Sequence, residues 1–227
     1  MKNTVRRWQA TASSAGLSIL FLVVYGSCNW LTAHRPHVGS IYFEWERFVP
    51  FVPLMIPAYL SLDLFFIGAP FLCRTNEELR AYSKRIAAAI LIAGSCFLLF
   101  PLRFAFSRPE SNGLLGTIFN WFRDIDAPNN LLPSLHAALL LLVGDVYLRY
   151  LRGGLRVTAF GWFVLIGVSP VLTYQHHLID IFAGFALAAS CFYLFPDCTA
   201  EKRTNTNSRI GFYYLFGSVS LIVASII

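Results

Sequence analysis

Charged residues are scarce in this chain of 227 residues, where Asp, Glu, Lys and Arg together make up only 13%. A soluble globular domain carries roughly 25% charged residues. Hydrophobic residues reach 56%, and the mean hydropathy is +0.59. This balance excludes an ordinary soluble enzyme and is typical of a protein built from membrane-spanning segments.

The chain also lacks the cysteine spacing of a disulfide scaffold or a zinc site. Its five cysteines are odd in number, show no C-x-x-C pattern and lie mostly inside or at the ends of apolar runs. We therefore expect small, buried hydrophobic residues at these positions. No internal repeat or low-complexity segment stands out, and the length suits one domain without a separate soluble catalytic module.

Long apolar runs are present, and each is close to the roughly 20 residues that a membrane-spanning helix needs. We expect an all-α, polytopic transmembrane bundle of six spans, with a seventh candidate at 210–227; the six are 14–33, 50–72, 86–102, 133–151, 157–174 and 178–195. Basic residues precede the first run, as in a signal peptide. The sequence at 25–30 is a poor cleavage site, so we expect an uncleaved first span.

The 18 Lys and Arg residues divide unequally between the two sides of this predicted bundle. Five fall in the connections of one side, namely Arg35, Arg47, Arg103, Arg108 and Arg123, and the others fall on the opposite side. The positive-inside rule makes the richer side cytoplasmic. The net charge of +6 therefore reflects membrane topology, and no nucleic-acid partner is expected. The loops 34–49, 103–132 and 175–177 then face outside, with a short interfacial helix expected over 114–125.

Three groups of polar residues lie on the predicted outer side: two contain histidines, and the third contains arginines. His176 and Asp180 open the sixth span and are four residues apart, so they share one face of a helix. A carboxylate bonded to one imidazole nitrogen leaves the other nitrogen free as a nucleophile or base. His136 opens the fourth span and could protonate a leaving oxygen.

The same outer side offers groups that suit a phosphate. Arg103 and Arg108 follow the third span, and guanidinium groups match phosphate oxygens well. The backbone amides of Ser134 and Leu135 open the fourth helix and could add to an anion site.

Each of these features has a simpler interpretation. A single histidine at the end of a span is usually an interfacial residue. His177 is three residues from Asp180 and could replace His176 as its partner, although His176 is preferred. His34 and His37 have a metal-like spacing, but their loop contains proline and no third ligand, so solvated loop residues are expected and no metal site is predicted.

The residues at 133–136, Pro-Ser-Leu-His, and the His176-x3-Asp180 spacing lead to a resemblance. The chain resembles the type 2 phosphatidate phosphatase superfamily of lipid phosphatases and phosphotransferases, over about residues 50–195. That family carries the blocks K-x6-R-P, P-S-G-H and S-R-x5-H-x3-D. The third block would begin here at Ser169. The P-S-L-H sequence and the doubled histidine look closer to the branch containing inositol-phosphorylceramide synthases.

The resemblance implies a role for each residue that matches the family's blocks. His176 would attack phosphorus and form a phosphohistidine, Asp180 would orient it, and His136 would protonate the leaving alcohol and then activate water. No metal or other cofactor is implied. Three departures stand out: Pro101 lies where the first block has lysine, Leu135 replaces glycine, and Pro170 replaces an arginine that would bind phosphate.

The sequence therefore predicts a metal-independent lipid phosphatase at the outer face of a membrane. Residues 1–49 would form the first span and an outer loop, 50–195 the catalytic core, and 196–227 a cytoplasmic loop and terminal hydrophobic segment. A phosphorylated lipid and the bilayer are the expected partners, and the expected location is a bacterial plasma membrane with a periplasmic site. The oligomeric state stays open. Two rivals remain: a phosphotransferase that moves a phospho-head group to an alcohol, and an inactive scaffold or lipid-binding protein of the same fold.

Overall fold

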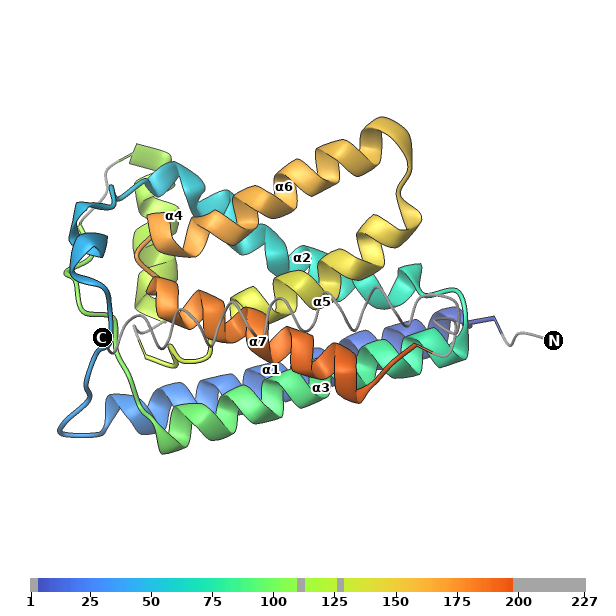
Figure 1. The fold of residues 1–227 in the computed structure, drawn as a ribbon, viewed down its shortest axis with the longest axis horizontal. Coiled ribbons are helices and arrows are strands. Elements are labelled where there is room, and N and C mark those ends of the chain that lie inside the picture. The colour runs from blue at the N-terminus through green and yellow to red at the C-terminus, as the bar shows by residue number, and fades with distance from the viewer. Residues whose placement is uncertain (1–3, 110–112, 126–128, 198–227) are drawn as a thin grey trace.

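The structure is a computed structural model that describes residues 4–109, 113–125 and 129–197. In this part of the chain the elements, in order, are α1 (Arg7–Ala33), η1 (Glu44–Phe48), η2 (Pro53–Met55), α2 (Ile56–Leu72), α3 (Asn76–Leu99), α4 (Gly113–Ile125), α5 (Leu135–Tyr150), α6 (Gly153–Leu172) and α7 (Leu178–Leu194). The α-helices pack into one bundle (Figure 1). The all-α prediction is therefore confirmed, and a helix lies at each of the six predicted runs and at the predicted short helix. The seventh candidate, 210–227, lies outside the described residues.

Four helical segments in the described ranges have the length and composition to cross a membrane. They are Arg7–Ala33, Pro53–Leu72, Asn76–Leu99 and Gly153–Leu172, and Leu178–Leu194 is a shorter apolar helix. Residues on the outside of α1 show the expected surface, because Ile19, Leu22 and Val23 are large, apolar and exposed. The fold is that of a membrane protein with four candidate spans.

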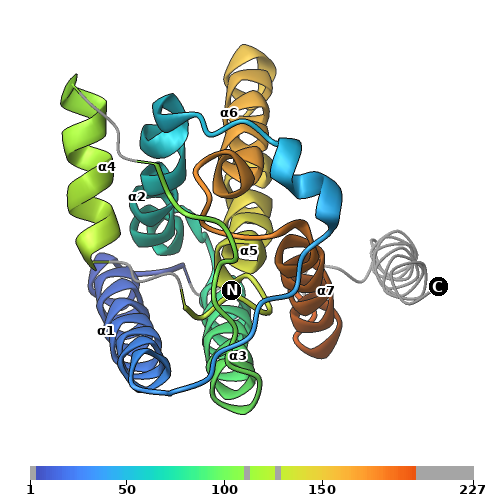
Figure 2. The ribbon, with the colours of Figure 1, turned by 90° about the vertical axis from the view of Figure 1, so that its left-hand side faces the viewer.

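Helix α5 lies at the centre of the bundle when it is viewed end-on (Figure 2). It packs against α2, α3, α6 and α7. Its buried side chains include Ala138, Leu142 and Val143, which are apolar on more than one face of the helix. A helix that is apolar on most sides is covered by other helices. With 16 residues and a rise of 1.5 Å per residue, α5 is about 24 Å long, which is shorter than the roughly 30 Å of a bilayer core.

The connections gather at the two ends of the bundle (Figure 1). The segments 34–55, 100–109 and 173–177 lie at one end, here called the site end, and residues 73–75, 151–152 and 195–197 lie at the opposite end. Successive connections therefore alternate between the two ends, as the unequal distribution of Lys and Arg over the connections predicted. Every histidine and arginine proposed for the chemistry lies at the site end, with His136 in the first turn of α5 and the others in the connections.

The opposite end is held by a network of buried and half-buried ion pairs. Arg149 contacts Asp145 one turn before it on α5, as well as Glu78 on α3 at 3.0 Å and Asp197 at 2.8 Å. Arg85 on α3 contacts Asp197 at 3.4 Å. The pair of Asp145 with Arg149 thus belongs to a set of contacts that joins α3, α5 and the segment after α7.

Candidate active site

The start of α5 carries the first part of the site. Ser134 is the N-cap, and its hydroxyl accepts the backbone N–H of Ala137 at 3.2 Å. The side chain of Leu135 is buried in the core, so this residue can meet a ligand only through its backbone. The first amides of a helix lack partners inside the helix and point out of its end. The positive end of α5 therefore faces the site end of the bundle.

His136 lies in the first turn of α5 and is half-buried. Its ring stacks on Tyr59 of α2, with centroids 4.3 Å apart and planes 8° from parallel. Its Nε2 lies 3.3 Å from the carbonyl oxygen of Ile166 on α6. A carbonyl only accepts, so Nε2 carries the proton and Nδ1 of the neutral ring has a lone pair. Helices α2 and α6 thus fix both the plane of this imidazole and its tautomer.

His176 and Asp180 form the second part of the site, at the start of α7. Nδ1 of His176 lies 3.6 Å from Oδ2 of Asp180, and both side chains are buried. The same Oδ2 accepts the backbone N–H of His177 at 2.8 Å, which holds the carboxylate at the helix start. The predicted spacing therefore does place the imidazole beside the carboxylate, slightly beyond hydrogen-bond distance.

The two parts of the site are joined directly by their backbones. The N–H of Ser134 donates to the carbonyl oxygen of Asp180 at 2.9 Å. One turn further along α7, Gly184 permits this approach, because a Cβ there would overlap the carbonyl oxygen of Ser134. The imidazoles of His136 and His176 are close enough that a positive charge on either would repel one on the other. The structure thus brings His136, His176 and Asp180 to one place between α5 and α7.

His177 has a different environment from His176. Its side chain is fully buried, its Nδ1 lies 2.8 Å from Oε2 of Glu46, and its Nε2 accepts the backbone N–H of Ala105 at 3.1 Å. The ring also stacks on Phe104, with centroids 4.2 Å apart. Both nitrogens of His177 are therefore engaged, whereas Nδ1 of His176 has no hydrogen bond to any residue that the structure describes. This difference favours His176 as the reactive histidine of the pair.

Unpartnered polar atoms gather around His176. Oε1 of Gln175, Nδ1 of His176 and Oδ1 of Asp180 are all buried, and none has a hydrogen-bond partner within the described ranges. A buried polar atom without a partner costs on the order of 1–3 kcal/mol. Three such atoms within six residues of chain mark a place where the fold gives up stability, which is typical of binding and catalytic sites.

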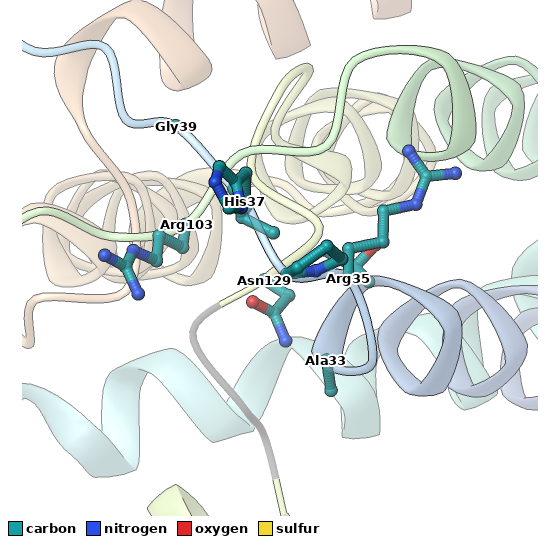
Figure 3. A pocket seen from close by; sticks show the side chains of 9 residues that line it. Ala33, Arg35, His37, Gly39, Arg103 and Asn129 are labelled. Atoms are coloured by element: carbon teal, nitrogen blue, oxygen red, sulfur yellow. The ribbon is translucent and has the colours of Figure 1, made fainter.

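The two predicted phosphate-binding arginines are placed differently. Nε of Arg108 donates to the carbonyl oxygen of Tyr174 at 2.9 Å, two residues before His176, so this guanidinium lies beside the loop that carries the histidine. The side chain of Arg103 lines an open cavity near Arg35 and His37 (Figure 3). None of His136, His176 and Asp180 lines that cavity.

Pro170 stands where the resembled family has an arginine, and its ring is buried in α6. Its carbonyl oxygen accepts two backbone N–H groups, from Gln175 at 2.8 Å and from His176 at 3.2 Å. This residue therefore shapes the tight connection between α6 and α7. The predicted block started at Ser169, whose hydroxyl bonds within α6 to the carbonyl oxygen of Ile166 at 2.8 Å.

Two residues of the site were not foreseen from the sequence. Glu46 is buried and accepts hydrogen bonds from His177 and from two backbone amides, those of Phe43 and Leu178. Tyr59 supports the His136 ring. The only sequence signal for Glu46 was an acidic residue in an aromatic-rich loop, and Tyr59 lay unmarked inside an apolar run.

Comparisons of this chain with protein-family models, with curated proteins and with solved structures find no match. The case for a function therefore rests on the geometry described above and on the sequence pattern.

Proposed function

We propose that the chain is a membrane enzyme that hydrolyses a lipid phosphate monoester through a phosphohistidine at His176. The observation that carries this proposal is the grouping of His176, Asp180 and His136 between α5 and α7, with buried polar atoms left unpartnered around His176. A positioned carboxylate, a nucleophilic imidazole and a second imidazole are the parts that such a reaction uses.

In the first half-reaction, Asp180 Oδ2, which lies 3.6 Å from His176 Nδ1 in the structure, moves closer to accept the N–H of Nδ1, and the lone pair on Nε2 attacks phosphorus. His136, which takes up a proton at Nδ1 as the anionic substrate binds, gives that proton to the lipid oxygen while the bond between this oxygen and phosphorus breaks. In the second half-reaction His136 takes a proton from water, the resulting oxygen attacks phosphorus, and the phosphorus–nitrogen bond breaks. Phosphate and free His176 result, so atoms and protons balance.

The negative charge on the transferred phosphoryl group must be stabilised, and this stabilisation usually supplies a large part of the rate enhancement in such reactions. The backbone amides of Leu135 and His136 at the start of α5 and the guanidinium of Arg108 are the groups that support this role. The amide of Ser134, expected from the sequence to contribute, donates instead to the carbonyl oxygen of Asp180. Because the side chain of Pro170 carries no charge, the site relies on these groups to stabilise the phosphoryl oxygens.

We further propose that six helices cross the membrane, with the site end outside. Besides the four candidate spans, α7 is an apolar helix. Helix α5 is short, but neighbouring helices cover it, so it needs no lipid-facing apolar surface along its whole length. The side richer in Lys and Arg is then cytoplasmic by the positive-inside rule.

The proposal is tested by phosphate release from phosphatidate, phosphatidylglycerophosphate, polyprenyl pyrophosphate and lipid A-type substrates, in detergent with EDTA. The wild type should release phosphate from at least one of them, and His176→Ala should not. His177→Asn provides the matched comparison: it changes the neighbouring histidine, which supports His176 but does not react, so the folded fraction should keep measurable, reduced activity where His176→Ala keeps none. Equal activity in wild type and His176→Ala would overturn the proposal.

Hydrolysis and head-group transfer share the phosphoenzyme and differ only in the acceptor. Adding diacylglycerol or a polyol to the same assay separates them, because only transfer forms a new phospholipid or phosphodiester.

A further inference from the structure

A cavity of about 520 Å³ opens at the site end, beside the end of α1 (Figure 3). Its lining includes the side chains of Arg35, His37 and Arg103, and no carboxylate belongs to the nine residues that line it. Small-molecule sites in proteins commonly enclose about 300–1,000 Å³. The size and the positive charge of the cavity both suit an anionic ligand larger than an ion.

The cavity is built by segments that the fold ties together. The backbone N–H of Arg103 donates to the carbonyl oxygen of Gly39 at 2.9 Å, which joins the loop after α1 to the loop after α3. Arg35 is held by a hydrogen bond from its guanidinium to the carbonyl oxygen of Leu98 at 2.9 Å. The guanidinium of Arg35 and the backbone that carries Arg103 are therefore held at the cavity by contacts that do not involve a ligand.

A second observation points to a ligand. Thr32 lines the cavity and is only 1% exposed, yet its hydroxyl has no hydrogen-bond partner among the described residues. A buried hydroxyl is normally satisfied by protein or by another molecule. This hydroxyl can donate to a phosphate oxygen or accept from a ligand hydroxyl.

The surroundings favour a lipid over a free ion. Trp30, two residues before Thr32 on α1, is 62% exposed, and exposed tryptophans at helix ends are typical of the level of lipid headgroups. In Figure 3 the side chains of Arg103 and Arg35 extend to opposite sides of His37, so a bare phosphate would not contact both guanidinium groups.

We infer that this cavity binds the phosphate-bearing headgroup of a membrane lipid, at a site separate from the phosphoryl group proposed to react at His176. Arg35 would contact the phosphate, Arg103 would contact the glycerol ester oxygens on the other side of His37, and the Thr32 hydroxyl would complete the site. The ligand class is an anionic phospholipid, and phosphatidate is a suitable probe.

The test is calorimetric titration of short-chain phosphatidate into the full-length His176→Ala protein in neutral detergent, where turnover is prevented. Hydrogen bonds to charged groups contribute about 1.5–3 kcal/mol, so Arg35→Gln should weaken binding about tenfold or more. Thr32→Val removes only the hydroxyl at nearly constant volume and should weaken binding several-fold. It keeps the test decisive if the arginine variant folds poorly.

Arg47→Gln is the matched control. Arg47 is also at the site end, but it is paired with Glu44 at 2.9 Å and does not line the cavity, so its variant should bind phosphatidate normally. Diacylglycerol with the same chains should bind at least tenfold more weakly than phosphatidate, because it lacks the anion.

Unchanged phosphatidate affinity in both Arg35→Gln and Thr32→Val would overturn the inference. Inorganic phosphate that binds as tightly as phosphatidate, and depends equally on Arg35, would instead identify a site for the free anion and overturn the lipid assignment. Failure of the wild type to release phosphate would count against the proposed function alone, because binding is measured without turnover.

Discussion

Nδ1 of His177 lies 2.8 Å from Oε2 of Glu46, although the two residues are 131 positions apart in the chain. This buried contact ties the loop after α1 to the start of α7. Because the other nitrogen of His177 accepts the N–H of Ala105, three segments of the site end meet at one imidazole. The neighbouring His176 is thereby held in place by a residue that takes no part in the proposed chemistry.

Removing Glu46 should therefore weaken the fold. Glu46→Ala leaves the His177 ring and the backbone N–H groups of Phe43 and Leu178 without their acceptor, at a cost of about 3 kcal/mol. By the scaling for domains of this size, the melting temperature in detergent should fall by roughly 6–12 °C. Glu44→Ala is the control, since Glu44 is exposed and pairs with an exposed arginine, and the melting temperature of this variant should stay within about 2 °C. Equal melting temperatures for the two variants would contradict this role of Glu46.

The close approach of α5 and α7 gives a second prediction. Gly184→Ala introduces a Cβ that meets the carbonyl oxygen of Ser134 and lies 2.9 Å from the Cβ of Ala137, so the helices must separate. Overpacking of this kind typically costs about 1–3 kcal/mol. We expect a lower melting temperature together with a large fall in kcat, because His136 and His176 lie on opposite sides of the contact.

A glycine on another helix provides the comparison for this variant. Gly161 of α6 is exposed, and a Cβ there meets nothing within 4 Å. Gly161→Ala should raise stability by about 0.5–1 kcal/mol through helix propensity and leave kcat unchanged. A Gly184→Ala enzyme with normal kcat would show that the α5–α7 spacing is not critical.

Asp180 has two separable roles, one in holding His176 and one in capping α7. Asp180→Asn keeps an oxygen that can accept the N–H of His177, so the melting temperature should change little. It removes the negative charge beside Nδ1 of His176, and kcat should fall by about 10²–10⁴. Asp180→Ala should lose the cap as well, at about 1 kcal/mol of stability. If Asp180→Asn kept full activity, the carboxylate would have no part in activating His176.

The ion pairs at the opposite end should affect stability without affecting chemistry. Arg149→Met leaves Glu78, Asp145 and Asp197 without this partner, and breaking a buried pair typically costs about 3–5 kcal/mol. The melting temperature should fall strongly, while kcat per folded molecule stays normal. Arg156→Gln, at an exposed position on α6, should change neither quantity. A selective loss of kcat in Arg149→Met would instead connect this network to the active site.

The helices could be predicted because apolar runs of near-membrane length are unambiguous, but their ends could not be read from hydropathy. Helix α3 was expected from residue 86 and begins at Asn76. Its first turns are polar, with Thr75 as N-cap and Glu77 and Glu78 in the first turn, so the helix extends beyond the apolar window. Hydropathy reports which residues suit a lipid environment, whereas helix ends follow capping.

Part of the candidate site could also be predicted from the sequence, and part could not. The meeting of His176 with Asp180 follows from helical spacing alone. The contact of His177 with Glu46 depends on how a loop folds back across the bundle, and no local pattern encodes it. The placement of Arg103 at a separate cavity has the same origin, because its backbone bond to Gly39 joins the loop after α3 to the loop after α1.

The most direct test of the account is to trap the phosphoenzyme. Phosphatidate, or whichever lipid proves to be the substrate, is labelled with ³²P in its phosphate, mixed with the protein for less than one turnover and quenched in alkali. Phosphohistidine survives alkali and is lost in acid, and peptide mapping should locate the label at His176. The label should be absent from His176→Ala and present in His177→Asn. Phosphate release by the wild type with no label at His176, or with label at another residue, would contradict the proposed mechanism.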